Sequence, residues 1–180
     1  MGTRHLITVI DEQGELKVAQ YGQFDGYPEG QGISMLNILH YTTRFDYNGK
    51  LVSDVARGLP RCRWAKQEEL DEIYNSLPEM NYLGTEDSDK FKMLYPNLHR
   101  ETSADILNVV AYSVGEVILV DESDFAEDEL FCEGIYSVNY QSQMFTSKYG
   151  FLTVSFPLND LPTNQEYLDA FEDRKSTRLN

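Results

Sequence analysis

Cysteine and histidine are scarce in this chain, and long apolar runs are lacking. The two cysteines, Cys62 and Cys132, match neither a metal-site spacing nor a disulfide framework. The three histidines, His5, His40 and His99, have no paired spacing, so we expect no metal site and no cofactor. No apolar run approaches the roughly 18 residues that cross a bilayer, and the N-terminus lacks an apolar secretion signal. We therefore expect a cytoplasmic protein without a membrane segment.

The chain does contain enough apolar residues for a folded core. Apolar residues make up 41% of the 180 positions and aromatic residues 12%, which fits one domain better than two. Neither an internal repeat nor a low-complexity tract interrupts residues 1–173, so we predict a single α+β domain there. Residues 174–180 are polar and basic and are predicted to form a flexible tail.

Hydrophobic periodicity predicts strands at both ends of the chain and helices between them. Alternation and turn residues indicate strands over 5–10, 16–21, 134–140, 143–149 and 151–156. Three- and four-residue spacing indicates helices over 33–43, 66–77, 89–94, 104–113 and 163–171. Runs of strands separated from runs of helices favour an antiparallel sheet over alternating βα units. The expected fold is α+β, with an antiparallel sheet built from an N-terminal hairpin and a C-terminal meander, and with helices packed on it.

The net charge of −15 is distributed unevenly. Residues 1–66 hold 8 Lys and Arg against 7 Asp and Glu, whereas residues 67–173 hold 4 against 23. The densest run, residues 121–133, has seven carboxylates in thirteen positions. Such a surface disfavours direct binding to nucleic acid and favours a basic protein partner. The alternative interpretation is a solvated face that only keeps the protein soluble.

Residues 20–32 are predicted to form a loop of defined shape, because they include four glycines, one proline and three aromatic residues. Glycine amides just before a helix are able to hold an anion. The candidate residues of such a small-molecule site are Tyr21, Gln23, Asp25, Tyr27 and Gly30. The loop matches neither the dinucleotide fingerprint nor a Walker A motif. In the structural alternative, Asp25, Tyr27 and Pro28 hold a tight turn while Phe24 fills the core.

No motif marks a catalytic centre, but two nucleophiles deserve comparison. Thr3 lies near the start of the hairpin, as in hydrolases with an N-terminal nucleophile, although removal of Met1 leaves Gly2 as the first residue. A thiol site would use Cys132, with a histidine as base and a carboxylate to orient it. The candidates for these two roles are His99 or His40, and Asp25 or Glu133.

Two segments of the chain resemble a known family. Met1 to Arg4 before a strand, followed by residues 17–32 with the Tyr-Gly-Gln-Phe-Asp-Gly-Tyr-Pro-Glu-Gly-Gln-Gly loop, resembles a largely uncharacterised family of phages and their bacterial hosts, with distant fungal relatives. Residues 130–138 resemble a second shared segment, although relatives tend to have Trp-Ala in place of Gly134-Ile135. The resemblance covers the first 40 residues strongly and the rest loosely. It implies a mobile-element setting, where small acidic proteins often block host defence systems such as CRISPR nucleases.

The charge distribution and the resemblance together favour a non-catalytic inhibitory protein of phage or mobile-element origin. It would bind a host defence nuclease through an acidic surface that mimics nucleic acid, in the host cytoplasm. The carboxylates expected to make this contact are Asp121, Glu122, Asp124, Glu127, Asp128 and Glu129, with a second patch of Glu86, Asp87 and Asp89. The alternatives are a hydrolase using Thr3, or Cys132 with His99, and a small-molecule-binding module using the 20–32 loop.

A basic island is the remaining feature of the sequence. It consists of Arg57, Arg61 and Arg63, close to the single tryptophan, Trp64. Such an island is able to pair with the carboxylates of a second copy of the chain. A homodimer is therefore a further prediction.

Overall fold

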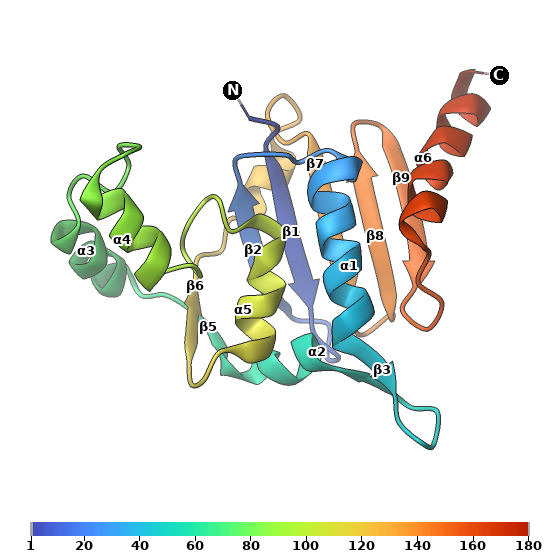
Figure 1. Cartoon of the computed structure of the whole chain (residues 1–180), viewed down its shortest axis with the longest axis horizontal. Helices are drawn as coiled ribbons and strands as arrows, with labels where there is room; N and C mark the ends of the chain where they lie inside the picture. The colour runs from blue at the N-terminus through green and yellow to red at the C-terminus, as the bar shows by residue number, and fades with distance from the viewer. Residues whose placement is uncertain (1, 180) are drawn as a thin grey trace.

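The computed structural model describes residues 2–179 and is built on a five-stranded sheet (Figure 1). The strands lie in the order β2-β1-β7-β8-β9. Their bounds are Leu16–Gly22, His5–Ile10, Gly134–Asn139, Met144–Tyr149 and Leu152–Pro157, in that order. The predicted hairpin and meander are both present and share this sheet, so the α+β class is confirmed.

The sheet is mixed, and the prediction of a purely antiparallel sheet is wrong. β1 pairs with β7 in parallel, from His5 opposite Gly134 to Ile10 opposite Asn139. The hairpin thus presents its first strand to the meander and leaves β2 at the edge. Parallel neighbours require a long crossover connection, and residues 23–133 provide it.

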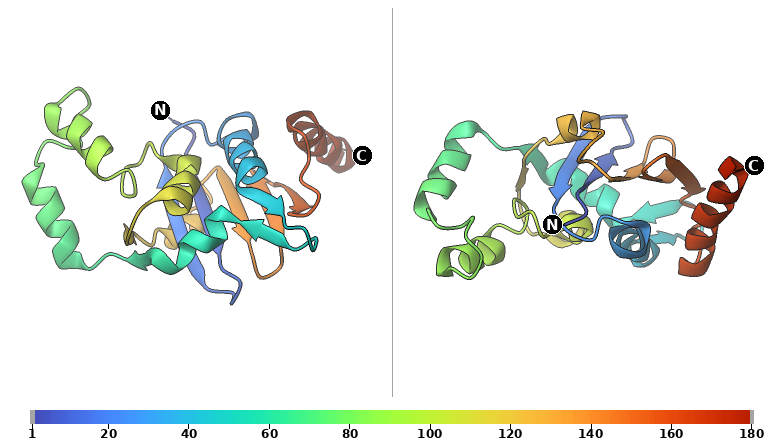
Figure 2. Two further views of the ribbon diagram at one scale, coloured as in Figure 1. Left: turned by 60° about the horizontal axis from the view of Figure 1, so that its bottom comes forward. Right: turned by 90° about the horizontal axis from the view of Figure 1, so that it is seen from above.

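The crossover places its helices mainly on one face of the sheet. Helices α1 and α5 lie side by side over this face, and the shorter α2 packs against α5 (Figures 1 and 2). Their bounds are Ile33–Thr42, Ile106–Tyr112 and Asp54–Gly58. A one-turn π-helix, η1, Pro28–Gly32, leads directly into α1. The main core lies between these helices and the sheet and includes Ile7, Val9, Leu36, Leu39 and Leu107, all with no exposed area.

The last helix, α6, packs beside β9 and closes the other end of the sheet. It spans Asn164–Leu179 and so continues beyond the predicted end at residue 171, through residues expected to form a flexible tail. Tyr167 is fully buried, and its hydroxyl donates a 2.8 Å hydrogen bond to Ser147 Oγ on β8. Near the end of α6, the Arg178 guanidinium lies 4.7 Å from the centre of the Phe151 ring. Within residues 2–179, no helix combines the length and apolarity needed to span a membrane.

Two short ribbons and several single turns complete the body. The antiparallel ribbon pairs β3 with β4, and the parallel ribbon pairs β5 with β6. Their bounds are Thr43–Phe45, Leu51–Ser53, Cys62–Trp64 and Val117–Leu119. Three 3-10 turns, η2, η3 and η4, span Leu59–Arg61, Ser103–Asp105 and Ser123–Glu127.

Helices α3 and α4 project away from the sheet (Figures 1 and 2). They span Gln67–Ser76 and Glu86–Leu94. Ile73, Leu77 and Phe91 form a small apolar cluster of their own, separate from the main core. We refer to residues 67–94 as the α3–α4 arm. The arm therefore has its own packing and presents a large surface to solvent.

The contact between α2 and α5 provides a stability test, because it depends on a glycine. A Cβ on Gly58 would lie 2.0 Å from the carbonyl oxygen of Val110. We expect Gly58→Ala to lower the free energy of unfolding by about 3 kcal/mol, since two helix backbones must separate. Gly49→Ala is the control. Its φ is 77° and a Cβ there would meet no heavy atom within 4 Å, so only strain of about 1 kcal/mol is expected.

Urea denaturation of both variants measures these differences. A loss for Gly58→Ala no larger than that for Gly49→Ala would contradict the close approach of α2 and α5.

Candidate functional site

The loop at residues 20–32 packs over the start of β1, and most of its amides are used within the chain. The amide of Gly26 donates to the Thr3 carbonyl over 3.0 Å, and that of Gly30 donates to the Tyr27 carbonyl over 3.0 Å. The amide of Gln31 donates to the Asp25 carbonyl over 2.8 Å. The amides of Gly26 and Gly30, two of the three glycine amides that the sequence offered as anion donors together with that of Gly32, already have acceptors. The loop geometry therefore favours a packing role over an anion site.

The side chains of the predicted loop site come together in two pairs. The Tyr21 hydroxyl donates to Gln23 Oε1 over 2.5 Å, and the Tyr27 hydroxyl donates to Asp25 Oδ1 over 3.2 Å. Asp25 has a φ of 59°, which marks the tight turn. Phe24 is 37% exposed and does not fill the core. The structure thus supports the turn role of Asp25 and Tyr27.

His5, which the sequence did not single out, lies buried beneath the loop. Its side chain has no exposed area, and a Cβ on Gly22 would lie 2.1 Å from His5 Nε2. Nδ1 lies 3.3 Å from the Thr3 carbonyl, whereas Nε2 has no hydrogen-bond partner. Burial lowers the pKa of His5 to about 4, so the imidazole is neutral at pH 7. Contact with the Thr3 carbonyl places its proton on Nδ1. The signal in the sequence that could have revealed the buried His5 is the pair of glycines Gly22 and Gly26, because both leave room for its ring.

The three candidate catalytic residues share no hydrogen bond with one another. Sγ of Cys132 lies 3.6 Å from the Gly134 carbonyl, and burial raises the pKa of this thiol to about 11. The thiol is therefore protonated at neutral pH and a poor nucleophile. His99 packs against Phe91, and its Nδ1 accepts from the Glu101 amide over 3.1 Å. Thr3 contributes its carbonyl to the turn at Gly26.

His40, the other candidate base, and Cys62, the second thiol, also share no hydrogen bond with Cys132. Nε2 of His40 lies 2.6 Å from the Pro162 carbonyl, away from the loop. Burial lowers the pKa of His99, while raising that of the second thiol, Cys62, to about 11. Within residues 2–179, no three His, Cys, Asp or Glu side chains are grouped so as to hold a metal ion.

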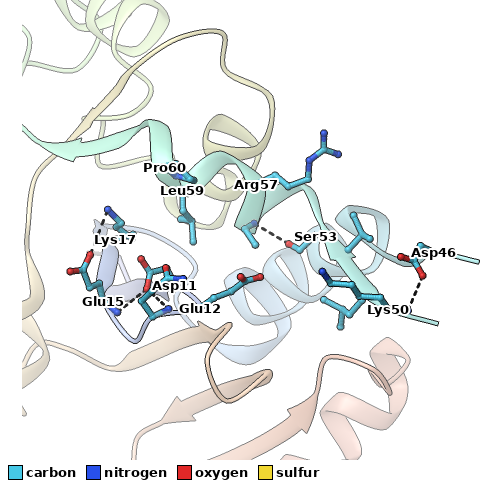
Figure 3. Close-up of a pocket in the computed structure, with 14 residues that line it drawn as sticks. Asp11, Glu12, Glu15, Lys17, Asp46, Lys50, Ser53, Arg57, Leu59 and Pro60 are labelled. Carbon is cyan, nitrogen blue, oxygen red and sulfur yellow. Dashed lines mark hydrogen bonds and ion pairs between the residues drawn. The ribbon is translucent and has the colours of Figure 1, made fainter. Parts of the chain in front are cut away.

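A cleft of about 610 Å³ lies between the β1–β2 turn and the segment that follows β3 (Figure 3). Its lining includes Leu51 and Leu59, and its charged residues are of both signs. Two of the acids stabilise turns: Asp11 Oδ1 accepts from the Glu15 amide over 2.9 Å, and Asp46 Oδ1 accepts from the Lys50 amide over 2.9 Å. The cleft thus follows from two neighbouring turns and has no convergent set of functional groups.

The basic island is largely neutralised within the chain. Arg63 forms a bidentate contact with Glu69 and also pairs with Glu116 over 2.8 Å. The Arg61 guanidinium donates to the Val110 carbonyl over 3.0 Å. Arg57, with 69% of its side chain exposed, has a looser contact with Asp54 at 3.8 Å. Arg57 is therefore the island residue best placed to meet a second copy.

The predicted acidic run folds over the free face of the sheet, on the opposite side from α1 and α5 (Figure 2). Glu122 anchors it: its amide donates to the Ala19 carbonyl over 3.1 Å, and its carboxylate accepts from the Tyr21 amide over 2.9 Å. Burial raises the pKa of Glu122. The Phe125 ring packs edge-on against Tyr21 with their centroids 5.0 Å apart. These contacts also cover the edge of β2, which would otherwise invite pairing with another strand.

The other carboxylates of the run face outward from this anchored turn. Asp128 is half-buried, and its Oδ1 accepts from the Phe131 amide over 3.1 Å. Glu133, at the end of the run, is exposed, and so are the remaining four carboxylates: Asp121, Asp124, Glu127 and Glu129. We refer to these four residues as the η4 acidic patch. Within the described chain none of the four forms an ion pair.

The second predicted patch forms the first turn of α4. Thr85 caps this helix by accepting from the Ser88 amide over 3.1 Å, and carboxylates in a first turn favour the helix dipole. Glu86 pairs with Lys90 over 2.8 Å, Asp87 accepts from the Glu79 amide over 3.1 Å, and Asp89 is exposed. The sequence-based reasoning missed three exposed carboxylates on α3, although their helical spacing was visible: Glu68, Asp71 and Glu72.

The buried imidazole of His5 generates a test of the loop packing. An NMR titration of the three imidazoles should give His5 a midpoint near pH 4, assigned with His40→Gln and His99→Gln variants. Because the unfolded chain takes up this proton near pH 6.5, His5 makes unfolding easier as the pH falls from 6.5 toward 4. The expected loss is about 2 kcal/mol by pH 5.

Urea denaturation at pH 7.5 and pH 5 measures this loss, and His5→Gln should remove it whereas His40→Gln should keep it. A His5 midpoint close to 6.5 would contradict the burial of this side chain.

The geometry of the described residues thus offers outward-facing carboxylates on two segments and no assembled catalytic group among the predicted candidates. Comparison with protein-family models, curated proteins and solved structures found no match to this chain.

Proposed function

We propose that the protein is a non-catalytic inhibitor that occupies the basic, nucleic-acid-binding groove of another protein. One observation carries the proposal: the four exposed carboxylates of the η4 acidic patch form no ion pair among the described residues. On the α3–α4 arm Glu86 pairs with Lys90, but four other exposed carboxylates form no ion pair there: Glu68, Asp71, Glu72 and Asp89. Basic residues of the first part of the chain are instead paired, as Arg63 is with Glu69 and Arg44 with Asp54. The negative surface is therefore free to meet a positive partner.

Carboxylates are able to replace phosphates against lysine and arginine side chains. The net charge of −15 speeds encounter with a basic groove and makes binding sensitive to salt. Because Glu122 and Phe125 fix the η4 turn on β2, its carboxylates are held in place before the partner arrives. Such preorganisation lowers the entropy lost on binding.

The nature of the partner follows from the sequence resemblance. Because the chain resembles a family found in phages and their hosts, we propose a host defence nuclease, for example a CRISPR effector, as the partner. Such nucleases carry the basic nucleic-acid channel that the proposal requires.

The test is neutralisation of the η4 acidic patch with Asp121→Asn, Asp124→Asn, Glu127→Gln and Glu129→Gln, leaving the anchoring Glu122 intact. A matched control removes the same charge elsewhere, with Glu12→Gln, Asp169→Asn, Glu172→Gln and Asp173→Asn, all exposed residues. Tagged proteins are used to capture nucleases from a bacterial lysate that contains defence systems, at about 0.1 M salt and about 0.5 M salt.

At the lower salt we expect the unaltered protein and the control variant to retain a nuclease, and the patch variant to bind it at least tenfold more weakly. At the higher salt we expect the unaltered protein and the control variant to lose the nuclease as well. DNA or RNA carrying the nuclease's own site should compete for it. Retention by the patch variant, or binding without such competition, would remove this proposal.

A further inference from the structure

A groove with a mixed lining opens inside the α3–α4 arm, at its junction with the body, and its polar part comes from Asn81, Ser88, His99 and Arg100. The groove has a volume of about 330 Å³. Its apolar lining comes from α3, from the connection to α4, from α4 itself and from the segment that follows: Tyr74, Met80, Leu83, Phe91 and Leu98. Phe91 is 7% exposed and forms the base, with the ring of Tyr74 centred 6.3 Å away and that of His99 5.6 Å away. The small apolar cluster of the arm is thus open on one side.

The arm also leaves large apolar side chains uncovered, one of them in the groove itself. Leu83, which lines it, is 72% exposed, and its neighbour Tyr82 is 67% exposed. On α4, Met93 is 80% exposed and Leu94 is 60% exposed. Single exposed apolar residues are normal, but grouped ones mark interaction sites.

The surroundings of the groove are strongly negative. The arm holds eight carboxylates and two lysines. Both lysines are engaged, because Lys90 pairs with Glu86 and Lys92 pairs with Glu101 over 2.9 Å. Arg100 is the one cation among the residues that line the groove. Phosphate-rich partners, such as nucleic acid or an anionic membrane, are therefore disfavoured.

We propose that this groove receives a large apolar or aromatic side chain carried by a lysine- and arginine-rich segment of the protein partner. The inference rests on the proposed function and adds a specificity element to it. Protein interfaces typically combine a central apolar anchor in a pocket with a charged rim. The carboxylates of the arm attract the basic segment, and the groove selects segments that carry the anchor. A volume of about 330 Å³ is at the lower end of ligand pockets, which suits one ring-bearing side chain.

Two lysine-rich, fluorescein-labelled peptides test the groove, one with a central tryptophan and one with serine at that position. Fluorescence anisotropy at about 0.1 M salt gives both affinities for the full chain. We expect the tryptophan peptide to bind about tenfold more tightly, as burial of an aromatic side chain allows. Leu83→Ser should reduce this advantage to less than about threefold and leave the affinity of the serine peptide unchanged.

Leu130→Ser is the matched control, because Leu130 is 77% exposed and lies outside the arm. It should keep the full preference for tryptophan. Far-UV circular dichroism verifies that both variants are folded, which the exposure of the two leucines favours.

The proposed role of the groove would be overturned if the two peptides bound with equal affinity. It would also be overturned if Leu83→Ser and Leu130→Ser changed the preference for the tryptophan peptide equally. Absence of binding by either peptide would overturn it as well. The η4 patch is judged separately, by nuclease capture, so failure of the groove and failure of the proposed function give different results.

Discussion

The parallel pairing of β1 with β7 is the contact on which the rest of the structure depends. It joins His5 to Gly134, residues far apart in the chain, and completes a single sheet from two separate hairpin units. Since β1 is filled on both sides, β2 is left as an edge. The segment from β2 to β7, residues 23–133, has to cross over one face of the sheet, and α1 and α5 of this segment cover the core there. The exposed edge of β2 is then covered by Glu122, so the acidic run lies where it does because of this pairing.

The glycine-rich loop is explained by the same junction. The Tyr136 hydroxyl, on β7, donates to the Gly26 carbonyl over 2.6 Å, and the Glu133 amide donates to the Arg4 carbonyl over 3.0 Å. A Cβ on Gly134 would lie 2.5 Å from that same Gly26 carbonyl. Residues 20–32 and the start of β7 therefore meet at one place. The glycines at Gly22, Gly26 and Gly134 are accounted for by close packing at this junction, where His5 is buried.

Local patterns predicted most of the local structure. The failures concern the non-local strand pairing, very short elements, and the end of α6, which continues to Leu179 through residues expected to form a flexible tail. Alternation located β1, β2 and the meander, because strand period is a property of neighbouring residues. The direction of β1 relative to β7 depends on how two distant units dock, which no local period encodes. The polar first turn of α4 resembled a loop, although Thr85 caps it. For the site, charge density located the η4 patch, but the anchoring role of Glu122 depends on a contact with β2 that only the fold creates.

The exposed acid is unfavourable for the fold taken alone. Surface ion pairs contribute little stability, and unpaired like charges repel one another in the compact state. The chain nevertheless pairs its cations with internal carboxylates at Arg63 and Arg44, leaving η4 and the arm negative. A solvated face requires charge but no anchoring, whereas the η4 turn is fixed by a half-buried glutamate and a ring contact. A fixed surface of unpaired carboxylates is consistent with the basic partner proposed above.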